Sequence, residues 1–170
     1  MDKISLRNKV LEQRKNIPVE EQNIVTEILI EKLKKLDVFI ESTHIGIYYP
    51  IQQELNLLTL IETYPNKHFY LPNIENGKIK YRLIKRLNSL IEAPFKLKEA
   101  PHDNPSIEDC ELYLIPCVAT SKLLRIGYGK GYFDQFLVNK KGYKLGITYP
   151  AFKFDFDLQE PHDILMDEIL

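Results

Sequence analysis

Hydrophobic positions recur at helical spacing along the first 36 residues. Residues 2–16 predict a short helix, and Pro18 is expected to open a second helix at its first turn, where proline is tolerated. The second helix carries apolar residues every three to four positions, at Ile24, Ile28, Leu29, Leu33 and Leu36. Two further helices are predicted, over residues 54–61, with Pro65 as the break, and over residues 132–139.

Short apolar runs between these helices predict strands. They cover residues 45–49, 68–71, 79–83, 112–115 and 143–149, with an Asn-Gly turn signal at 76–77. The stretch 85–109 holds three prolines and is expected to be mostly loop, and the tail after Pro150 is expected to be irregular. Strands alternating with helices predict one α/β domain over residues 1–170, with a central, mostly parallel sheet covered by helices on both faces.

Composition narrows the functional classes. The 170 residues carry a formal net charge of −1, which argues against a nucleic-acid-binding or membrane-binding surface, so an anion site must be a local cluster. No apolar run approaches the length of a membrane span, and the first residues lack the apolar stretch of a signal peptide. Cys110 and Cys117, the only cysteines, are expected to be small apolar residues in or beside a strand, in a reducing, cytoplasmic compartment.

The strongest candidate for chemistry is the stretch from Arg125 to Asp134, here called the glycine loop. Three of the chain's seven glycines, Gly127, Gly129 and Gly131, fall within five residues, after a strand and before a helix. Glycine lets backbone N–H groups approach a ligand closely, and such groups at the start of a helix bind anions. The spacing is neither a Walker A loop nor a Rossmann fingerprint. The alternative interpretation, a flexible turn, stays open, although Arg125 and Lys130 weigh against it.

A second cluster of positive charge lies on the first helix. Lys3, Arg7 and Arg14 are separated by four and seven residues, which places them within roughly 40° of one another around the helix. They could form an arm that contacts phosphates, or an ordinary solvated face with the charged groups in water.

Several carboxylates and aromatic residues allow both a structural and a functional interpretation. Asp134 is the last residue of the glycine loop, and a carboxylate beside a phosphate site is where Mg²⁺ is usually held, but an isolated aspartate more often caps a helix or pairs with a cation. Asp163 and Asp167 are weaker candidates, because tail carboxylates normally face solvent. Glu54 could cap a helix or bind the amino groups of a ligand. The four histidines lack metal-ligand spacing. Tyr128, Tyr132 and Phe133 could be core residues or a wall for a planar ring.

Four segments together resemble the 5-formyltetrahydrofolate cyclo-ligase family, also called methenyltetrahydrofolate synthetases. They are Lys3-x-x-Leu6-Arg7, Tyr49-Pro50-x-x-x-Glu54, the glycine loop, and His162-Asp163-x-x-x-Asp167-Glu168, in the order and spacing of the family. The glycine loop is similar to the signature RLGxGKGYYD, with Ile126 in place of the usual Leu and Phe133 in place of the usual Tyr. The resemblance covers nearly the whole chain.

The resemblance implies a three-layer α/β fold and an enzyme that uses ATP and Mg²⁺ to close 5-formyltetrahydrofolate into 5,10-methenyltetrahydrofolate. It implies that Lys3, Arg7 and Arg14 contact ATP phosphates, and that Arg125, Ile126, Gly127, Tyr128, Gly129, Lys130, Gly131, Tyr132 and Phe133 wrap the nucleotide. Lys130 and Arg125 would be catalytic, and Asp134 and Asp163 would hold Mg²⁺. The pocket for the reduced folate would be lined by Tyr49, Glu54, Tyr128, Gly129, Lys130, Gly131 and Tyr132. A monomer is expected.

Three rival interpretations remain at this point. A small-molecule kinase or another nucleotide-dependent transferase could use the same glycine loop and would release a stable phosphorylated product. A nucleic-acid-binding or nucleotide-binding module could use the basic helix, but net charge and the absence of a basic stripe argue against it. A family member that has lost its activity would have the same sequence pattern.

Overall fold

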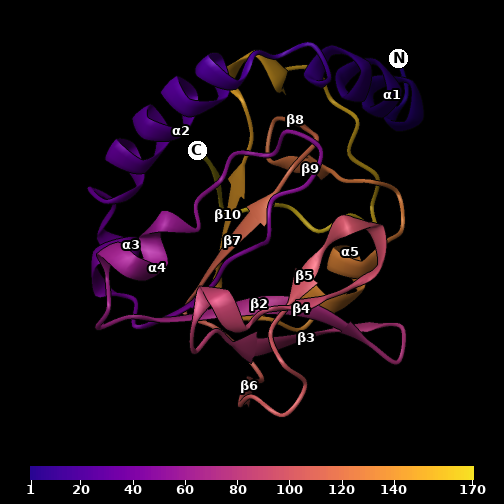
Figure 1. Ribbon diagram of the computed structural model, residues 1–170. Coiled ribbons are helices and arrows are strands. Elements are labelled where there is room, and N and C mark those ends of the chain that lie inside the picture. The colour runs from indigo at the N-terminus through magenta and orange to yellow at the C-terminus, as the bar shows by residue number, and fades with distance from the viewer.

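A seven-stranded sheet forms the centre of the computed structural model, which describes residues 1–170 (Figure 1). The strand order is β12-β10-β7-β1-β2-β3-β6. The strands are β1 His44–Gly46, β2 His68–Glu75, β3 Lys78–Leu83, β6 Ser106–Ile107, β7 Leu112–Pro116, β10 Tyr143–Ile147 and β12 Glu168–Ile169. Five neighbouring strands, from β12 to β2, run parallel, while β3 pairs antiparallel with β2 and with β6. The predicted mostly parallel sheet is confirmed.

Five α-helices pack around this sheet. They are α1 Lys3–Arg14, α2 Val19–Leu33, α3 Asp37–Glu41, α4 Thr59–Thr63 and α5 Tyr132–Leu137. The side chain of Asp2 caps α1 by accepting a hydrogen bond from the Ser5 amide at 2.7 Å. Pro18 stands directly before α2, where its missing N–H costs the helix no hydrogen bond. Single-turn 3₁₀ helices add Leu87–Ser89, Pro94–Lys96 and Pro150–Phe152.

Alternating residues of the buried strands point to opposite faces of the sheet. In β7, Leu112 and Leu114 belong to the larger hydrophobic cluster, which also contains residues of α1 to α4. Tyr113 and Ile115 belong to a smaller cluster, which contains Leu137 of α5. Figure 1 shows α2, α3 and α4 on one side of β7 and β10, and α5 on the other. Burial on both faces explains why these strands are continuous apolar runs in the sequence.

Several short strands were not predicted. A hairpin of β8 Ala119–Ser121 and β9 Leu124–Ile126 leads into the glycine loop, and β11 Lys153–Phe154 pairs with β8. The stretch predicted to be mostly loop contains β4 Ile91–Glu92, β5 Lys98–Glu99 and β6, and the tail expected to be irregular contains β11 and β12. Strands of two or three residues are too short to produce a recognisable hydrophobic period.

The helix predicted over residues 54–61 is wrong in its position, since α4 covers Thr59–Thr63. Local polar side chains explain the difference. The Glu54 carboxylate accepts a hydrogen bond from the Ile51 amide, and the Asn56 side chain accepts one from the Leu58 amide. Such bonds satisfy backbone donors without a helix, and residues 54–57 lie outside any helix.

Cys110 and Cys117 are buried, free thiols beside β7, as predicted: Cys117 directly follows the strand and Cys110 lies two residues before it. None of the helices has both the length and the apolar composition that crossing a lipid bilayer requires.

Candidate active site

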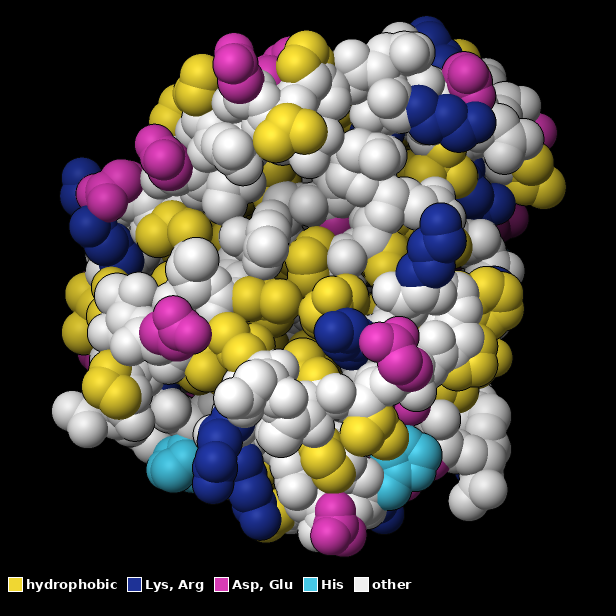
Figure 2. All heavy atoms as spheres, viewed as in Figure 1, with side chains coloured by type: hydrophobic (Ala, Val, Ile, Leu, Met, Phe, Trp, Pro, Cys, Tyr) yellow, Lys and Arg dark blue, Asp and Glu magenta, His cyan; other side chains and the backbone are white.

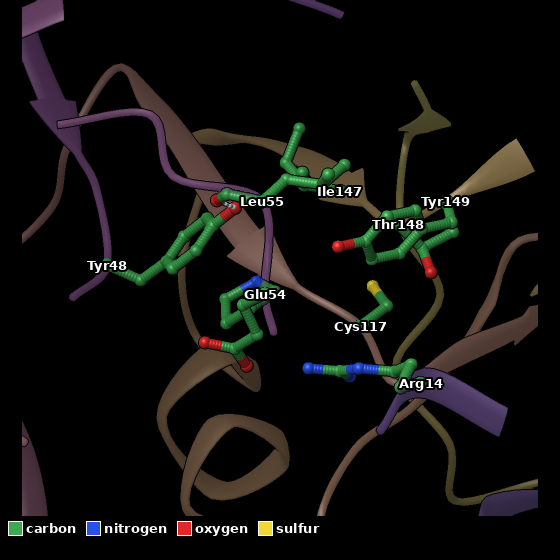
Figure 3. Close-up of a pocket in the computed structure, with 9 residues that line it drawn as sticks. Arg14, Tyr48, Glu54, Leu55, Cys117, Ile147, Thr148 and Tyr149 are labelled. Atoms are coloured by element: carbon green, nitrogen blue, oxygen red, sulfur yellow. Dashed lines mark hydrogen bonds between the residues drawn. The ribbon is translucent and has the colours of Figure 1, made fainter. Parts of the chain in front are cut away.

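Three neighbouring parallel strands, β1, β7 and β10, end at one small cavity (Figure 3). Its lining residues are Arg14, Tyr48, Glu54, Leu55, Pro116, Cys117, Ile147, Thr148 and Tyr149. The volume is about 10 Å³, which is room for about one water molecule, so a larger ligand must lie outside it or widen it. The carboxyl edge of parallel strands is where ligands bind in α/β folds.

The turn of residues 51–54, which follows β1, has an unusual backbone. Gln52 and Gln53 have φ angles of 46° and 62°, in the left-handed region that non-glycine residues rarely adopt. Each such residue costs on the order of 1 kcal/mol, so the conformation persists only where its surroundings hold it. Here the carbonyl oxygens are held: Arg14 Nη2 donates to Gln52 at 2.5 Å, and the Tyr149 hydroxyl donates to Gln53 at 2.5 Å.

Glu54 is the titratable group that this turn places in the cavity. One carboxylate oxygen accepts the Ile51 amide at 2.9 Å, and the other accepts the Tyr128 hydroxyl at 3.2 Å. Burial raises the pKa of Glu54 to about 7, while the Ile51 hydrogen bond and the charge of Arg14 act in the opposite direction and are outweighed. Figure 3 shows Arg14 extending toward Glu54, although the two groups form no ion pair within 4.0 Å. Glu54 therefore remains available to a partner from a ligand.

The glycine loop has the features of an anion site. Gly129 and Gly131 have φ angles of 90° and 74°, which only glycine adopts without strain. The amide groups of residues 128–131 donate no hydrogen bond within the protein. The loop ends at α5, whose first residue, Tyr132, follows Gly131. Free amides beside two cations, Arg7 and Lys130, are suited to phosphate oxygens.

Arg125, the first residue of the glycine loop, is held in place by two contacts. Its Nε donates to the Pro116 carbonyl oxygen at 2.8 Å, and its guanidinium lies 4.7 Å from the centre of the Phe133 ring. A Cβ atom at Gly127 would lie 2.3 Å from the Arg125 guanidinium. Gly127 is therefore needed for close packing against Arg125, and Ile126 beside it is buried in β9.

The three cations of α1 all reach the site but have different surroundings. Lys3 Nζ pairs with Asp163 at 2.6 Å and with Glu160 at 2.7 Å. Arg7 Nε donates to the Gly127 carbonyl oxygen at 2.6 Å. Arg14 is 1 % exposed and bonds to the 51–54 turn and to the Tyr128 hydroxyl. The solvated-face interpretation is therefore wrong for Arg14, whose side chain is buried, and its expected contact with phosphate stays a prediction.

Asp134 and Asp163, the two expected metal ligands, have different surroundings. Asp163 lies in a cluster with Glu160 and His162 whose ligand atoms are all within 4.8 Å of one another. Although partial burial opposes the effect, the hydrogen bond from Lys3 keeps the pKa of Asp163 below its usual value, so this carboxylate is ionised. Asp134 lies in the first turn of α5, is exposed, forms no ion pair and is not part of that cluster. Sequence reasoning missed Glu160.

Sequence reasoning also missed Phe95, at the tip of the β4–β5 hairpin. Its ring is 70 % exposed, and Lys130 Nζ lies 3.1 Å from the ring centre. Figure 2 shows the surrounding face hollowed near its centre, with hydrophobic side chains in the hollow and Lys or Arg side chains along its right-hand rim. An aromatic residue between Pro94 and Lys96 in a polar stretch was the only sequence signal for this position.

The remaining expected folate residues lie on two sides of the sheet. Tyr49 is partly buried against the larger cluster, and it is Tyr48, not Tyr49, that lines the small cavity. Tyr128 contacts Glu54 directly. Tyr132 packs against the smaller cluster and lines a groove with Phe136 of α5. The geometry thus joins Tyr128 to Glu54 and leaves Tyr49 and Tyr132 at the periphery.

Fold and site together define a class: a mostly parallel α/β protein whose glycine loop, with the features of an anion site, lies beside a carboxylate cavity. The family model described as the 5-formyltetrahydrofolate cyclo-ligase family matches residues 1–170, and the chain belongs to this enzyme family, which confirms the resemblance seen in the sequence.

Individual relatives agree over the full length. A protein of Mycoplasma pneumoniae named 5-formyltetrahydrofolate cyclo-ligase is 28 % identical over 177 residues, covering 100 % of this chain and 98 % of the relative. The NMR structure of the 5,10-methenyltetrahydrofolate synthetase of Aquifex aeolicus is similar with a TM-score of 0.89 and 32 % identity, covering 99 % of this chain and 89 % of that one. The synthetase structure from Mycoplasma pneumoniae, at 24 % identity and a TM-score of 0.79, supports the fold.

Proposed function

We propose that this protein cyclises 5-formyltetrahydrofolate to 5,10-methenyltetrahydrofolate, consuming ATP with Mg²⁺ and releasing ADP and phosphate. Family membership over residues 1–170 supports the reaction class, and relatives at 28 % and 32 % identity carry names of this activity. The observation that carries the proposal is the convergence of α1, the glycine loop and the C-terminal segment, through the bonds from Arg7 to Gly127 and from Lys3 to Asp163.

The residues present fit a nucleotide. Free amides at residues 128–131 and two positive-φ glycines leave room for phosphate oxygens at the backbone. We assign the triphosphate to Lys3, Arg7 and residues 125–133. Lys130 would lie nearest the transferred phosphate, and Arg125 would support the loop by packing against it. Phosphoryl transfer depends mostly on positioning and charge neutralisation, which these groups supply.

Two carboxylates of this region offer the oxygen ligands that Mg²⁺ prefers. Asp163 is ionised and has Glu160 and His162 beside it, while Asp134 is exposed with no partner of its own. We assign Asp163 and Asp134 as the residues that would hold the ion. When bound, Mg²⁺ neutralises phosphate charge, since it takes carboxylate and phosphate oxygens together. Lys3 would then exchange part of its pairing with Asp163 for phosphate.

The folate is assigned to the cavity side of the site. Glu54 would accept hydrogen bonds from the amino groups of the pterin, with Tyr128 beside it, and with Tyr49, Tyr132 and residues 129–131 around the rest of the substrate. Glu54 lacks a cationic partner within the protein and is therefore suited to this task. Phe95 and Lys130 lie together where the two substrates would meet.

The chemistry follows from the stability of the formyl group. The formyl carbon on N5 is an amide carbon, so its oxygen is a poor leaving group. Transfer of the γ-phosphoryl group to that oxygen makes a phosphate ester and releases ADP. N10 then attacks the carbon, its proton goes to water, and phosphate departs with the C–O bond electrons, which leaves the cyclic methenyl product. Lys130 would stabilise charge developing on the transferred group.

The test is a spectrophotometric assay at the absorbance band of the methenyl product. Product is expected only when 5-formyltetrahydrofolate, ATP and Mg²⁺ are all present, and Lys130→Ala should lower turnover by about tenfold or more. Absence of product from the purified, folded protein would contradict the proposal. A stable phosphorylated product would favour the rival small-molecule kinase.

Three further assignments accompany this function. The protein is proposed to act as a monomer. Two buried, free thiols support a reducing compartment such as the cytoplasm. Separate hydrophobic clusters on the two faces of the sheet support a three-layer arrangement.

A further inference from the structure

Arg14, at the C-terminal end of α1, contacts two separate segments of the site. Its Nη2 atom donates to the Gln52 carbonyl oxygen at 2.5 Å and to the Tyr128 hydroxyl at 3.3 Å, with the Ile51 carbonyl oxygen at 3.4 Å. Through these bonds one guanidinium connects the 51–54 turn to the glycine loop. Glu54 belongs to the turn, and its carboxylate accepts the Tyr128 hydroxyl.

We propose that Arg14 is a positioning residue that holds the 51–54 turn in its left-handed form and so keeps Glu54 and Tyr128 aimed at the folate. The inference rests on the proposed function, because it assigns Arg14 to the folate half of that reaction. It replaces the expected contact between Arg14 and ATP phosphates.

The turn needs such support. Two consecutive glutamines, Gln52 and Gln53, adopt positive φ angles, a conformation that L side chains disfavour. Each carbonyl oxygen is held by a side chain from a distant segment, Arg14 for Gln52 and Tyr149 for Gln53. Without these two donors the turn would relax toward ordinary φ values, and the Glu54 carboxylate, which follows directly in the chain, would move.

The surroundings of Arg14 argue against direct phosphate binding. The residue is 1 % exposed, and its Nε atom is buried with no hydrogen-bond partner. Arg14 lines the small cavity together with Glu54 and Tyr149, on the side assigned to the folate. Arg7 differs, because its guanidinium lies beside Gly129 in the glycine loop. The two arginines of α1 thus serve different substrates.

The experiment compares Arg14→Lys with Arg7→Lys in steady-state kinetics and in equilibrium binding of a non-hydrolysable ATP analogue. Lysine keeps the charge but loses the planar fork that reaches two acceptors. Arg14→Lys should raise the KM for 5-formyltetrahydrofolate by about tenfold, with the nucleotide Kd within about twofold of wild type. Arg7→Lys should instead raise the nucleotide Kd and leave the KM for 5-formyltetrahydrofolate nearly unchanged. Tyr149→Phe removes the hydroxyl that donates to the Gln53 carbonyl oxygen. This smaller change should also raise the folate KM, and the variant is expected to fold.

A rescue variant separates positioning from general damage. Glycine adopts positive φ freely, so Gln53→Gly in the Arg14→Lys background should recover part of the folate KM. A raised nucleotide Kd in Arg14→Lys would overturn the proposal and restore the phosphate role, and an unchanged folate KM in both Arg14→Lys and Tyr149→Phe would also overturn it. If Arg14→Lys fails to fold, Tyr149→Phe with and without Gln53→Gly decides. A wild-type protein without turnover would instead contradict the proposed function, while folate binding by calorimetry would still test Arg14.

Discussion

The burial of Glu54 costs the free protein stability, a cost that the proposed folate binding would offset. Its carboxylate faces Arg14, Arg125 and the Tyr128 hydroxyl, yet burial still raises its pKa from 4.5 to about 7. A carboxyl group whose folded pKa is raised binds its proton more tightly in the folded state. The cost of ionising it is absent below pH 4.5, grows between pH 4.5 and about 7, and stays constant above that range. A bound pterin amino group would supply the missing partner.

Glu54→Gln should therefore stabilise the free protein at high pH. At pH 8 the free energy of unfolding is expected to rise by on the order of 2 kcal/mol, because the neutral amide has no charge to desolvate. Near pH 5 the gain should nearly vanish, since Glu54 is protonated in the folded protein. Urea denaturation at the two pH values measures this difference. An equal gain in stability at both pH values would show that the charge of Glu54 is not the cause. Folate binding should be lost in Glu54→Gln at both pH values.

At the scale of elements, the sequence predicted the parts whose signals are local. The long helices α1 and α2, the buried strands β7 and β10, and the Asn-Gly turn between β2 and β3 all follow from hydrophobic period or turn chemistry. The β8–β9 hairpin was missed because its turn uses Lys122 at positive φ, in place of a glycine. The α4 boundary was wrong because side-chain bonds of Glu54 and Asn56 compete with the helix.

The candidate site was predictable only in part, for the same reason. The glycine loop could be predicted, because its three glycines lie within five residues of sequence. The partners of Lys3 could not be predicted, because Glu160 and Asp163 are 157 and 160 positions away in the chain. The support of the 51–54 turn by Arg14 and Tyr149 is likewise a product of tertiary packing, and no local pattern signals a left-handed glutamine pair.

The glycine loop and the β2–β3 turn provide a matched pair of glycines. Gly131 and Gly77 have φ angles of 74° and 75°, and a Cβ atom would meet nothing within 4 Å at either position. Alanine at either position should cost about 1 kcal/mol of stability from backbone strain alone. Only Gly131→Ala should also lower turnover, by about tenfold or more, because it moves the loop amides.

Thermal unfolding and steady-state assays of both variants check this expectation. Gly77→Ala serves as the control for strain without a functional consequence. Equal turnover in the two variants, at equal loss of stability, would show that the backbone of the glycine loop does not position substrate.

At the scale of the whole molecule, the two ends of the chain meet at the site. Lys3, at the start of α1, pairs with Glu160 and Asp163 in the C-terminal segment, and Arg7 holds the glycine loop from the same helix. Figure 1 shows the C-terminal segment passing beside α1. Partial burial lowers the pKa of Lys3, but its bonds to the two carboxylates outweigh that effect and raise it. The site proposed for the nucleotide is therefore built from segments that only the complete fold brings together.

The measurement that tests this assembly most directly is hydrogen exchange of the backbone amides, with and without a non-hydrolysable ATP analogue and Mg²⁺. Protection is expected at residues 128–131, in the first turns of α1 and at residues 160–163 together, while the turn at residues 76–77 stays unchanged. Protection confined to other segments, with the amides of the glycine loop exchanging as fast as in the free protein, would contradict the assignment of the nucleotide to this site.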